Sequence, residues 1–248
     1  MPTYRDDALV LRSHLLGESD KILTLLCRKH GKIRAVAKGV RKTTSRFGAR
    51  LQLFNQIDVL LNKGKSLDIV QQVESLSSLS EPIGKNYEKY TSAMVMVEAA
   101  DKLTDHDFQP QHYMLLLAGL RSLAKGEHGP TLIVNSYLLR ALAIAGWSPS
   151  FDVCAVTGAK GNHSRFAIDL GGLVSDEVAP AGSFRLDEKT LGLLQALIEG
   201  NWPKAEAALD PASLSQASRL ISAYTQFHLE KNVRSLAHLD HAAEQVPS

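Results

Sequence analysis

Ten lysine and arginine side chains lie between residues 21 and 50, and no aspartate or glutamate separates them. Such side chains donate hydrogen bonds to phosphate oxygens and displace the counterions that condense on a nucleic acid. The first acidic residue after the run is Asp58. The pattern therefore predicts a surface for a polyanion, with nucleic acid as the leading candidate.

The charge of the chain is unevenly divided. Residues 1–80 carry 14 basic and 7 acidic side chains, whereas residues 81–248 carry 14 basic and 19 acidic ones. A net charge of +2 for the whole chain thus conceals a basic N-terminal part. Only Tyr4, Phe47 and Phe54 in that part could stack on bases. We therefore expect binding led by phosphate contacts, with weak sequence preference.

Five short segments rich in Leu, Ile and Val precede residue 80, with turn residues between them. We expect strands at residues 8–14, 21–28, 33–38, 52–61 and 67–73. Five strands in this length predict a small barrel of the oligonucleotide-binding (OB) type over residues 1–80. The basic residues between Gly39 and Arg50 would then form a long connection between the third and fourth strands.

A helical period replaces the strands after residue 80. It predicts an α-helical domain over residues 81–248, with helices near residues 87–102, 112–124, 132–145, 187–198 and 213–233 and a break at residues 200–203. Residues 149–183 are rich in glycine and proline and predict a small β-rich insert, with a hairpin that turns at Gly171-Gly172. The predicted fold class is α+β and multidomain.

Nothing in the sequence indicates an enzyme, and we predict no catalytic residues. Gly64-Lys65-Ser66 imitates the end of a phosphate-binding loop, but Val59 occupies the required upstream glycine position. Cys27 and His30 lack an identifiable orienting residue. Two cysteines, no signal peptide and no long apolar run predict a cytoplasmic, nucleoid-associated protein that makes no membrane contact.

Several short motifs occur in order along the chain. The first part contains Gly31-Lys32-Ile33, residues 37–42 (AKGVRK), Ser45-Arg46-Phe47 and residues 51–54 (LQLF), and the helical part contains residues 138–142 (LLRAL) and 146–149 (GWSP). Together they resemble the bacterial RecO family of DNA repair and recombination proteins. The resemblance spans essentially the whole chain.

That resemblance implies an OB barrel on a helical domain and a recombination mediator rather than an enzyme. It implies binding of single- and double-stranded DNA, annealing of complementary strands, and binding of the acidic C-terminal tail of single-stranded DNA-binding protein. It also implies joint action with RecR in loading RecA. Cationic side chains that screen phosphate repulsion and leave base edges free suit annealing.

Many members of that family hold a zinc ion in the insert through two Cys-x-x-Cys pairs, and this chain departs from the pattern. Cys154 matches the first ligand, but Thr157, Ser175 and Val178 stand at the other positions. One thiolate cannot complete the tetrahedral site of a structural zinc. We therefore expect no metal and no other cofactor.

The candidate DNA-binding residues are the cations of the basic run and its one aromatic: Lys32, Arg34, Lys38, Arg41, Lys42, Arg46, Phe47 and Arg50. Arg140, in an otherwise apolar helix, is the candidate for binding the acidic partner tail.

Two alternatives remain open at this stage. One is an RNA-binding or ribosome-associated module that uses the same barrel, because charge alone does not distinguish DNA from RNA. The other is an enzyme of nucleic-acid metabolism, which the lack of paired carboxylates or an activated nucleophile disfavours.

Overall fold

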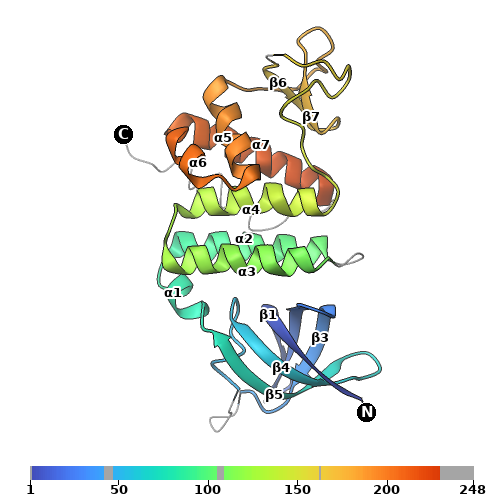
Figure 1. Cartoon of the computed structure of the whole chain (residues 1–248). Coiled ribbons are helices and arrows are strands. Elements are labelled where there is room, and N and C mark those ends of the chain that lie inside the picture. Colours follow the sequence, from blue (N-terminus) through green and yellow to red (C-terminus); the bar gives the residue numbers. More distant parts are fainter. Residues whose placement is uncertain (1, 42–46, 105–108, 162, 230–248) are drawn as a thin grey trace. The chain divides into compact units, whose positions relative to one another are not determined.

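The computed structural model describes residues 2–41, 47–104, 109–161 and 163–229 (Figure 1). The chain divides into two compact units. The first comprises residues 1–93 and 97–127, and the second comprises residues 94–96 and 128–248. The first unit thus extends past the expected domain boundary at residue 80, and the boundaries at residues 80, 149 and 183 stay predictions.

The first unit contains a closed five-stranded barrel, which confirms the predicted OB-like fold (Figure 1). Its strands are β1 (Thr3–Leu16), β2 (Asp20–Cys27), β3 (Gly31–Ala37), β4 (Gln56–Asn62) and β5 (Asp68–Ser77). All neighbours in the order β1-β2-β3-β5-β4 are antiparallel except β3 and β5. That parallel pair joins Ala35 to Asp68 and closes the barrel.

Alternation along the strands fills the barrel interior with small and branched side chains. Ala8 and Val10 of β1 pack there with Leu23 and Leu25 of β2. Leu9, Leu11 and Leu26 occupy the opposite phase and are nevertheless fully buried. Barrel strands with apolar side chains on both faces need a second covering layer, because each buried leucine contributes about 2 kcal/mol only if water is excluded.

Three helices of the first unit follow the barrel: α1 (Ser80–Gly84), α2 (Tyr87–Leu103) and α3 (Pro110–Lys125). Asn86 caps α2 by accepting a hydrogen bond from the Lys89 amide. Pro110 begins α3, where a first helical turn accepts a proline, and Gly126 ends it in the left-handed conformation. Gln56 of β4 donates a buried hydrogen bond to the Tyr113 hydroxyl of α3 at 3.0 Å. This bond fixes α3 against the barrel.

The second unit contains α4 (Pro130–Ile144), α5 (Glu188–Glu199), α6 (Trp202–Ala207) and α7 (Pro211–Leu229). The predicted break at residues 200–203 is wrong in part, because α6 begins at Trp202. Asn201 caps it, and Pro203 is tolerated in the first helical turn, where its missing N–H costs nothing. The expected end of the last helix near residue 233 falls outside the described residues.

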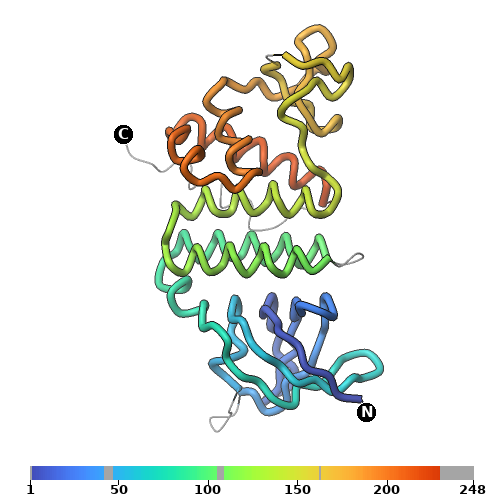
Figure 2. The backbone as a smooth tube through the Cα atoms, in the orientation of Figure 1, coloured from blue at the N-terminus to red at the C-terminus, as the bar shows by residue number. Residues whose placement is uncertain are grey.

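The insert between α4 and α5 is a three-stranded sheet with long irregular connections (Figure 2). Its strands are β6 (Arg165–Ala167), β7 (Gly172–Val174) and β8 (Phe184–Arg185). The predicted two-residue turn at Gly171-Gly172 is wrong. Ala167 pairs with Gly172, so Gly172 is already in the strand and the turn takes up residues 168–171. Gly172 lies against Ser150. A Cβ on Gly172 would come within 3.1 Å of the Ser150 carbonyl oxygen, and this close approach explains why residue 172 is a glycine.

Candidate nucleic-acid interface

The basic connection runs from the end of β3 to the start of β4 and covers residues 38–55. Residues 42–46 lie outside the described part, and with them the predicted contacts Lys42 and Arg46. The expected strand start at Gln52 is wrong, because β4 begins at Gln56. Residues 47–55 form successive tight turns instead, with Phe54 in the left-handed region at φ 72°.

The β1–β2 turn holds the start of this connection. Asp20 accepts a hydrogen bond from the Gly39 amide at 2.7 Å. The Arg41 amide donates to the Ser19 carbonyl at 3.0 Å, and its guanidinium Nη1 donates to the Glu18 carbonyl at 2.9 Å. The Arg41 guanidinium thus already has a hydrogen-bond partner within the protein, although the side chain remains exposed.

The end of the connection is fastened to the barrel. Leu51 is buried in the barrel core, and Phe47 packs against the same core while remaining partly exposed. The Asn55 side-chain amide donates to the carbonyls of Ala49 and Arg50 at 3.1 and 3.3 Å. The Arg50 guanidinium donates to the Val73 carbonyl at 3.0 Å. Phe47, the predicted stacking residue, therefore has a packing role in the barrel.

Lys32 lies on the face of the barrel that α2 covers. Its Nζ donates to the Asp101 carbonyl at 2.6 Å and to the Asp101 carboxylate at 3.0 Å, and its side chain is only 17% exposed. Arg12 of β1 bonds the other carboxylate oxygen at 2.8 Å. Asp101 thus draws two cations of the barrel towards α2, and it offsets part of the positive charge counted in the sequence.

Arg34 and Lys38 remain available for a ligand. Both side chains are exposed, and within the described residues neither makes an ion pair. Arg34 is on the outer face of β3, paired with Thr24, and Lys38 follows the end of that strand. These two residues, with Arg41 and Arg50, are the described predicted contacts that lie exposed at the surface.

The turn between β2 and β3 also carries cations, Arg28 and Lys29, that are not among the predicted contacts. Asp6, whose side chain is fully buried, accepts hydrogen bonds from the amides of Lys29 and His30 at 3.0 and 3.1 Å and lies 2.6 Å from His30 Nδ1. These bonds fix the turn that presents Lys29 at the surface, while the exposed Arg28 forms an ion pair with Asp7 at 3.7 Å. The signal in the sequence was Asp6, an acidic residue within a predicted barrel region that also contains the basic turn at residues 28–30.

Arg140 of α4 lies beside the C-terminal end of α5. Gly200 caps α5 in the left-handed conformation, and a Cβ on Gly200 would come within 3.0 Å of the Arg140 Nη1. The carbonyl end of a helix carries partial negative charge and attracts a cation. The arrangement therefore explains Arg140 within the unit, and it leaves a guanidinium that an acidic ligand could bind.

Cys154, at the first of the four expected zinc-ligand positions, is buried in the insert. Hydrogen bonds from the Thr157 hydroxyl and from the amides of Thr157, Ser175 and Val156 lower the pKa of its thiol from 9.0 to about 6. Thr157, Ser175 and Val178 supply no thiolate, so the residues present do not fit a zinc ion.

Comparison with known proteins places the chain among DNA repair proteins. The family models Recombination protein O N terminal and Recombination protein O C terminal match residues 1–79 and 84–237. The chain is 45% identical to the DNA repair protein RecO of Nocardioides sp., over 96% of this chain and 99% of that one. It is 44% identical to RecO of Thermobifida fusca, over 98% and 100%, and 42% identical to RecO of Streptomyces coelicolor, over 97% and 100%. None of the described helices is long and apolar enough to cross a membrane.

The contrast between Lys32 and Lys38 gives a first prediction. Lys32→Gln should lower the free energy of unfolding by roughly 1.5–3 kcal/mol, because it removes a charged donor from Asp101. Lys38→Gln should leave stability within about 0.5 kcal/mol of wild type and instead reduce the slope of log affinity against log salt by about 0.7 for single-stranded DNA. Urea unfolding followed by circular dichroism and fluorescence anisotropy measure the two effects. A loss of salt slope in Lys32→Gln as large as that in Lys38→Gln would contradict the assignment.

Cys154 gives a second prediction. Absorbance at 240 nm should rise in a single step near pH 6 as its thiolate forms, because burial raises the pKa of the other thiol, Cys27. Thr157→Val should move the midpoint upward. The pKa of the folded state lies below that of the unfolded thiol, so the thiolate stabilises the fold above the unfolded value, and this contribution is lost as the pH falls through about 6. Cys154→Ser is the control. A midpoint near 8.5, the value of an ordinary thiol, would contradict the hydrogen-bonded thiolate.

Proposed function

The chain belongs to the RecO family of DNA repair proteins, and from this premise we propose that it is a mediator that binds single- and double-stranded DNA through the basic face of its barrel. The family acts in DNA repair and recombination. On this proposal the protein promotes annealing of complementary strands and assists RecA loading with RecR on DNA coated by single-stranded DNA-binding protein. We place it in the cytoplasm, at the nucleoid, with no enzymatic step of its own.

The observation that carries the proposal is the exposure of Arg34 and Lys38 beside the anchored start of the basic connection. A cation on a rigid strand meets a phosphate at a small cost in entropy, because the backbone that carries it is already ordered. Arg28 and Lys29 extend the accessible charge at the β2–β3 turn.

Annealing follows from what this surface lacks as well as from its charge. Two strands repel through their phosphates, and a basic surface lowers that repulsion. Of the aromatic residues in residues 1–80, Phe54 is buried and Phe47 packs against the barrel core, so few rings are free to stack on bases. Bases that the protein does not hold remain able to pair with a second strand.

The acidic tail of single-stranded DNA-binding protein requires a cation next to apolar surface. Arg140 meets this requirement in outline, because its guanidinium lies at the end of α5 while the residues around it in α4 are apolar. A carboxylate ligand would compete with the helix carbonyls and offer a stronger, fully charged acceptor.

The DNA-binding proposal predicts that Arg34→Gln with Lys38→Gln weakens binding of a labelled single-stranded oligonucleotide and slows annealing. Each lost phosphate contact should reduce the slope of log affinity against log salt by about 0.7. Fluorescence anisotropy at several salt concentrations measures the slope. A matched control is Lys85→Gln with Lys125→Gln, which removes two exposed cations that lie outside the basic run.

Equal effects of the two pairs would overturn the choice of surface. An RNA oligonucleotide of the same sequence should be tested in parallel. Tighter binding of RNA than of DNA would contradict a role in DNA repair and favour the RNA-binding alternative.

The tail proposal predicts that Arg140→Gln weakens binding of a synthetic peptide with the acidic C-terminal tail of the cell's single-stranded DNA-binding protein. Removal of one charge-assisted hydrogen bond should cost roughly tenfold in affinity. Isothermal titration calorimetry measures it, and Arg219→Gln, an exposed arginine on α7, is the control. Unchanged binding in Arg140→Gln would place the tail elsewhere.

A further inference from the structure

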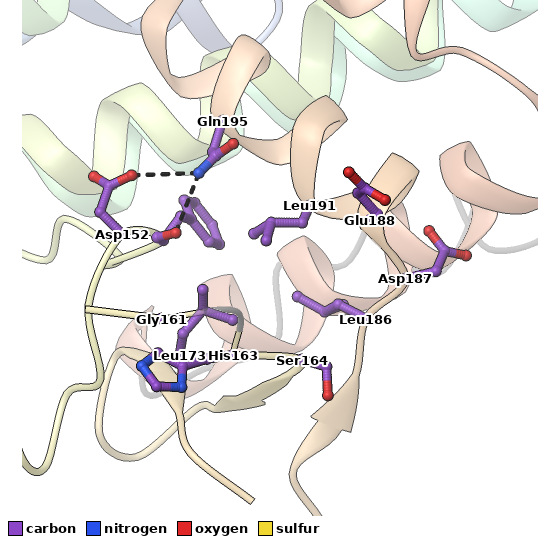
Figure 3. Close-up of a pocket in the computed structure, with 11 residues that line it drawn as sticks. Asp152, Gly161, His163, Ser164, Leu173, Leu186, Asp187, Glu188, Leu191 and Gln195 are labelled. Atoms are coloured by element: carbon purple, nitrogen blue, oxygen red, sulfur yellow. Dashed lines mark hydrogen bonds between the residues drawn. The ribbon is translucent and has the colours of Figure 1, made fainter. Parts of the chain in front are cut away.

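A groove of about 390 Å³ lies within the second unit, between the insert and the first turns of α5. Figure 3 shows its lining. The volume falls in the range of sites that hold a ligand or a few side chains of a partner. The groove is separate from the basic connection, from Cys154 and from Arg140, none of which lines it.

The middle of the groove is apolar. Leu173 of β7, Leu186 from the segment before α5, and Leu191 of α5 point into the same space (Figure 3). Phe151 lines it as well. Leu191 is partly exposed, whereas Leu173 and Leu186 are buried at the base. An aliphatic side chain that entered the groove would cover this surface and gain about 25 cal/mol for each Å² removed from water.

Carboxylates lie at both ends of the apolar part. Asp152 is at one end, and Asp187 and Glu188 are at the other (Figure 3). Asp152 accepts a hydrogen bond from Gln195 at 3.3 Å, and Asp187 caps α5 by accepting one from the Thr190 amide at 2.7 Å. Neither donor is charged, so the negative charge is not neutralised.

No cation of the described residues pairs with these three carboxylates. Lys189, the next residue along α5, lies instead 3.4 Å from Asp210. The Nε2 atom of His163, in the groove wall, lies 2.9 Å from the Ala159 carbonyl oxygen. The groove therefore combines an apolar floor with acidic ends, the opposite charge from the basic connection of the barrel.

We propose that this groove binds a basic segment of a partner protein, in which lysine or arginine side chains flank a leucine-like side chain. The aliphatic side chain occupies the space between Leu173, Leu186 and Leu191, and the two cations reach Asp152 and Glu188. The stems of lysine and arginine also cover apolar surface while their charged ends stay in water. Nucleic acid and acidic peptides are excluded, because their charge repels the carboxylates at both ends.

This inference does not depend on DNA binding by the barrel. The probe is a fluorescein-labelled peptide of sequence Ser-Gly-Lys-Leu-Leu-Arg-Gly-Ser, titrated with the full-length protein and followed by anisotropy. We expect a dissociation constant of about 100 μM or tighter. Replacing both cations of the peptide by glutamate, or both leucines by serine, should weaken binding by tenfold or more, on the order of 1.4 kcal/mol.

Matched protein variants locate the site. Glu188→Gln, at the groove, should weaken binding roughly fivefold. Glu199→Gln, at the other end of the same helix, makes the same change of charge outside the groove and should leave binding unchanged. Leu191→Ser removes part of the apolar surface and should weaken binding as well, while circular dichroism checks that the helices are retained.

Three outcomes would overturn the proposal. One is the absence of binding by the peptide at millimolar protein concentration. A second is equal binding by Glu188→Gln and wild type, which would place the peptide elsewhere. The third is displacement of the peptide by spermidine at the peptide's own concentration. Such displacement would show a site for simple polycations, in which the leucines play no part.

Discussion

The parallel pairing of β3 with β5 is the constraint on which the rest of the first unit depends. It joins Ala35 to Asp68 and Val36 to Ile69, and it closes the sheet so that no edge strand is left unpaired. Because β3 meets β5 and not β4, the chain must leave the barrel after Ala37 and return at Gln56. Of the basic residues on this connection, the described ones are Lys38, Arg41 and Arg50, and they lie outside the barrel strands. Their anchors, Asp20 and Asn55, stand near the two ends of the connection.

Dense positive charge destabilises a folded surface by mutual repulsion, and three buried or half-buried carboxylates relieve it here. Asp6 organises the turn that carries Lys29 and His30, Asp20 holds Gly39, and Asp101 binds Lys32 and Arg12. Each carboxylate offsets positive charge that could have attracted phosphate, and it also fixes a segment that presents the remaining cations. The proposed binding surface is therefore smaller than the run of ten basic residues in the sequence, but hydrogen bonds fix the segments that carry it.

Strand composition predicted the barrel well, because short segments rich in Leu, Ile and Val are separated by glycine and short polar residues that form turns. It failed at residues 52–55, where an apolar run of strand-like composition forms a turn; Leu53 and Phe54 pack on the protein without pairing in a ladder. It also missed α6, because Trp202-Pro203 reads as a break unless Asn201 is recognised as a cap. For the proposed site, the sequence offered Lys32 and Lys38 as equal candidates and could not separate them. The difference between them comes from Asp101, 69 positions further along the chain.

Selectivity in this protein must come from elements other than charge. A surface of exposed lysines and arginines binds any polyanion and weakens steeply with salt, so it discriminates little between one strand and another. On the proposed function, that property suits release of DNA for pairing with a second strand. Choice of a protein partner needs shape and apolar contact, which the barrel's basic connection does not offer. In the second unit, buried leucines lie next to isolated charges, both around Arg140 and in the groove by α5. Such a surface binds a ligand of matching charge and aliphatic surface more tightly than others. A mismatched ligand leaves a carboxylate or a guanidinium without a partner and so binds with lower affinity.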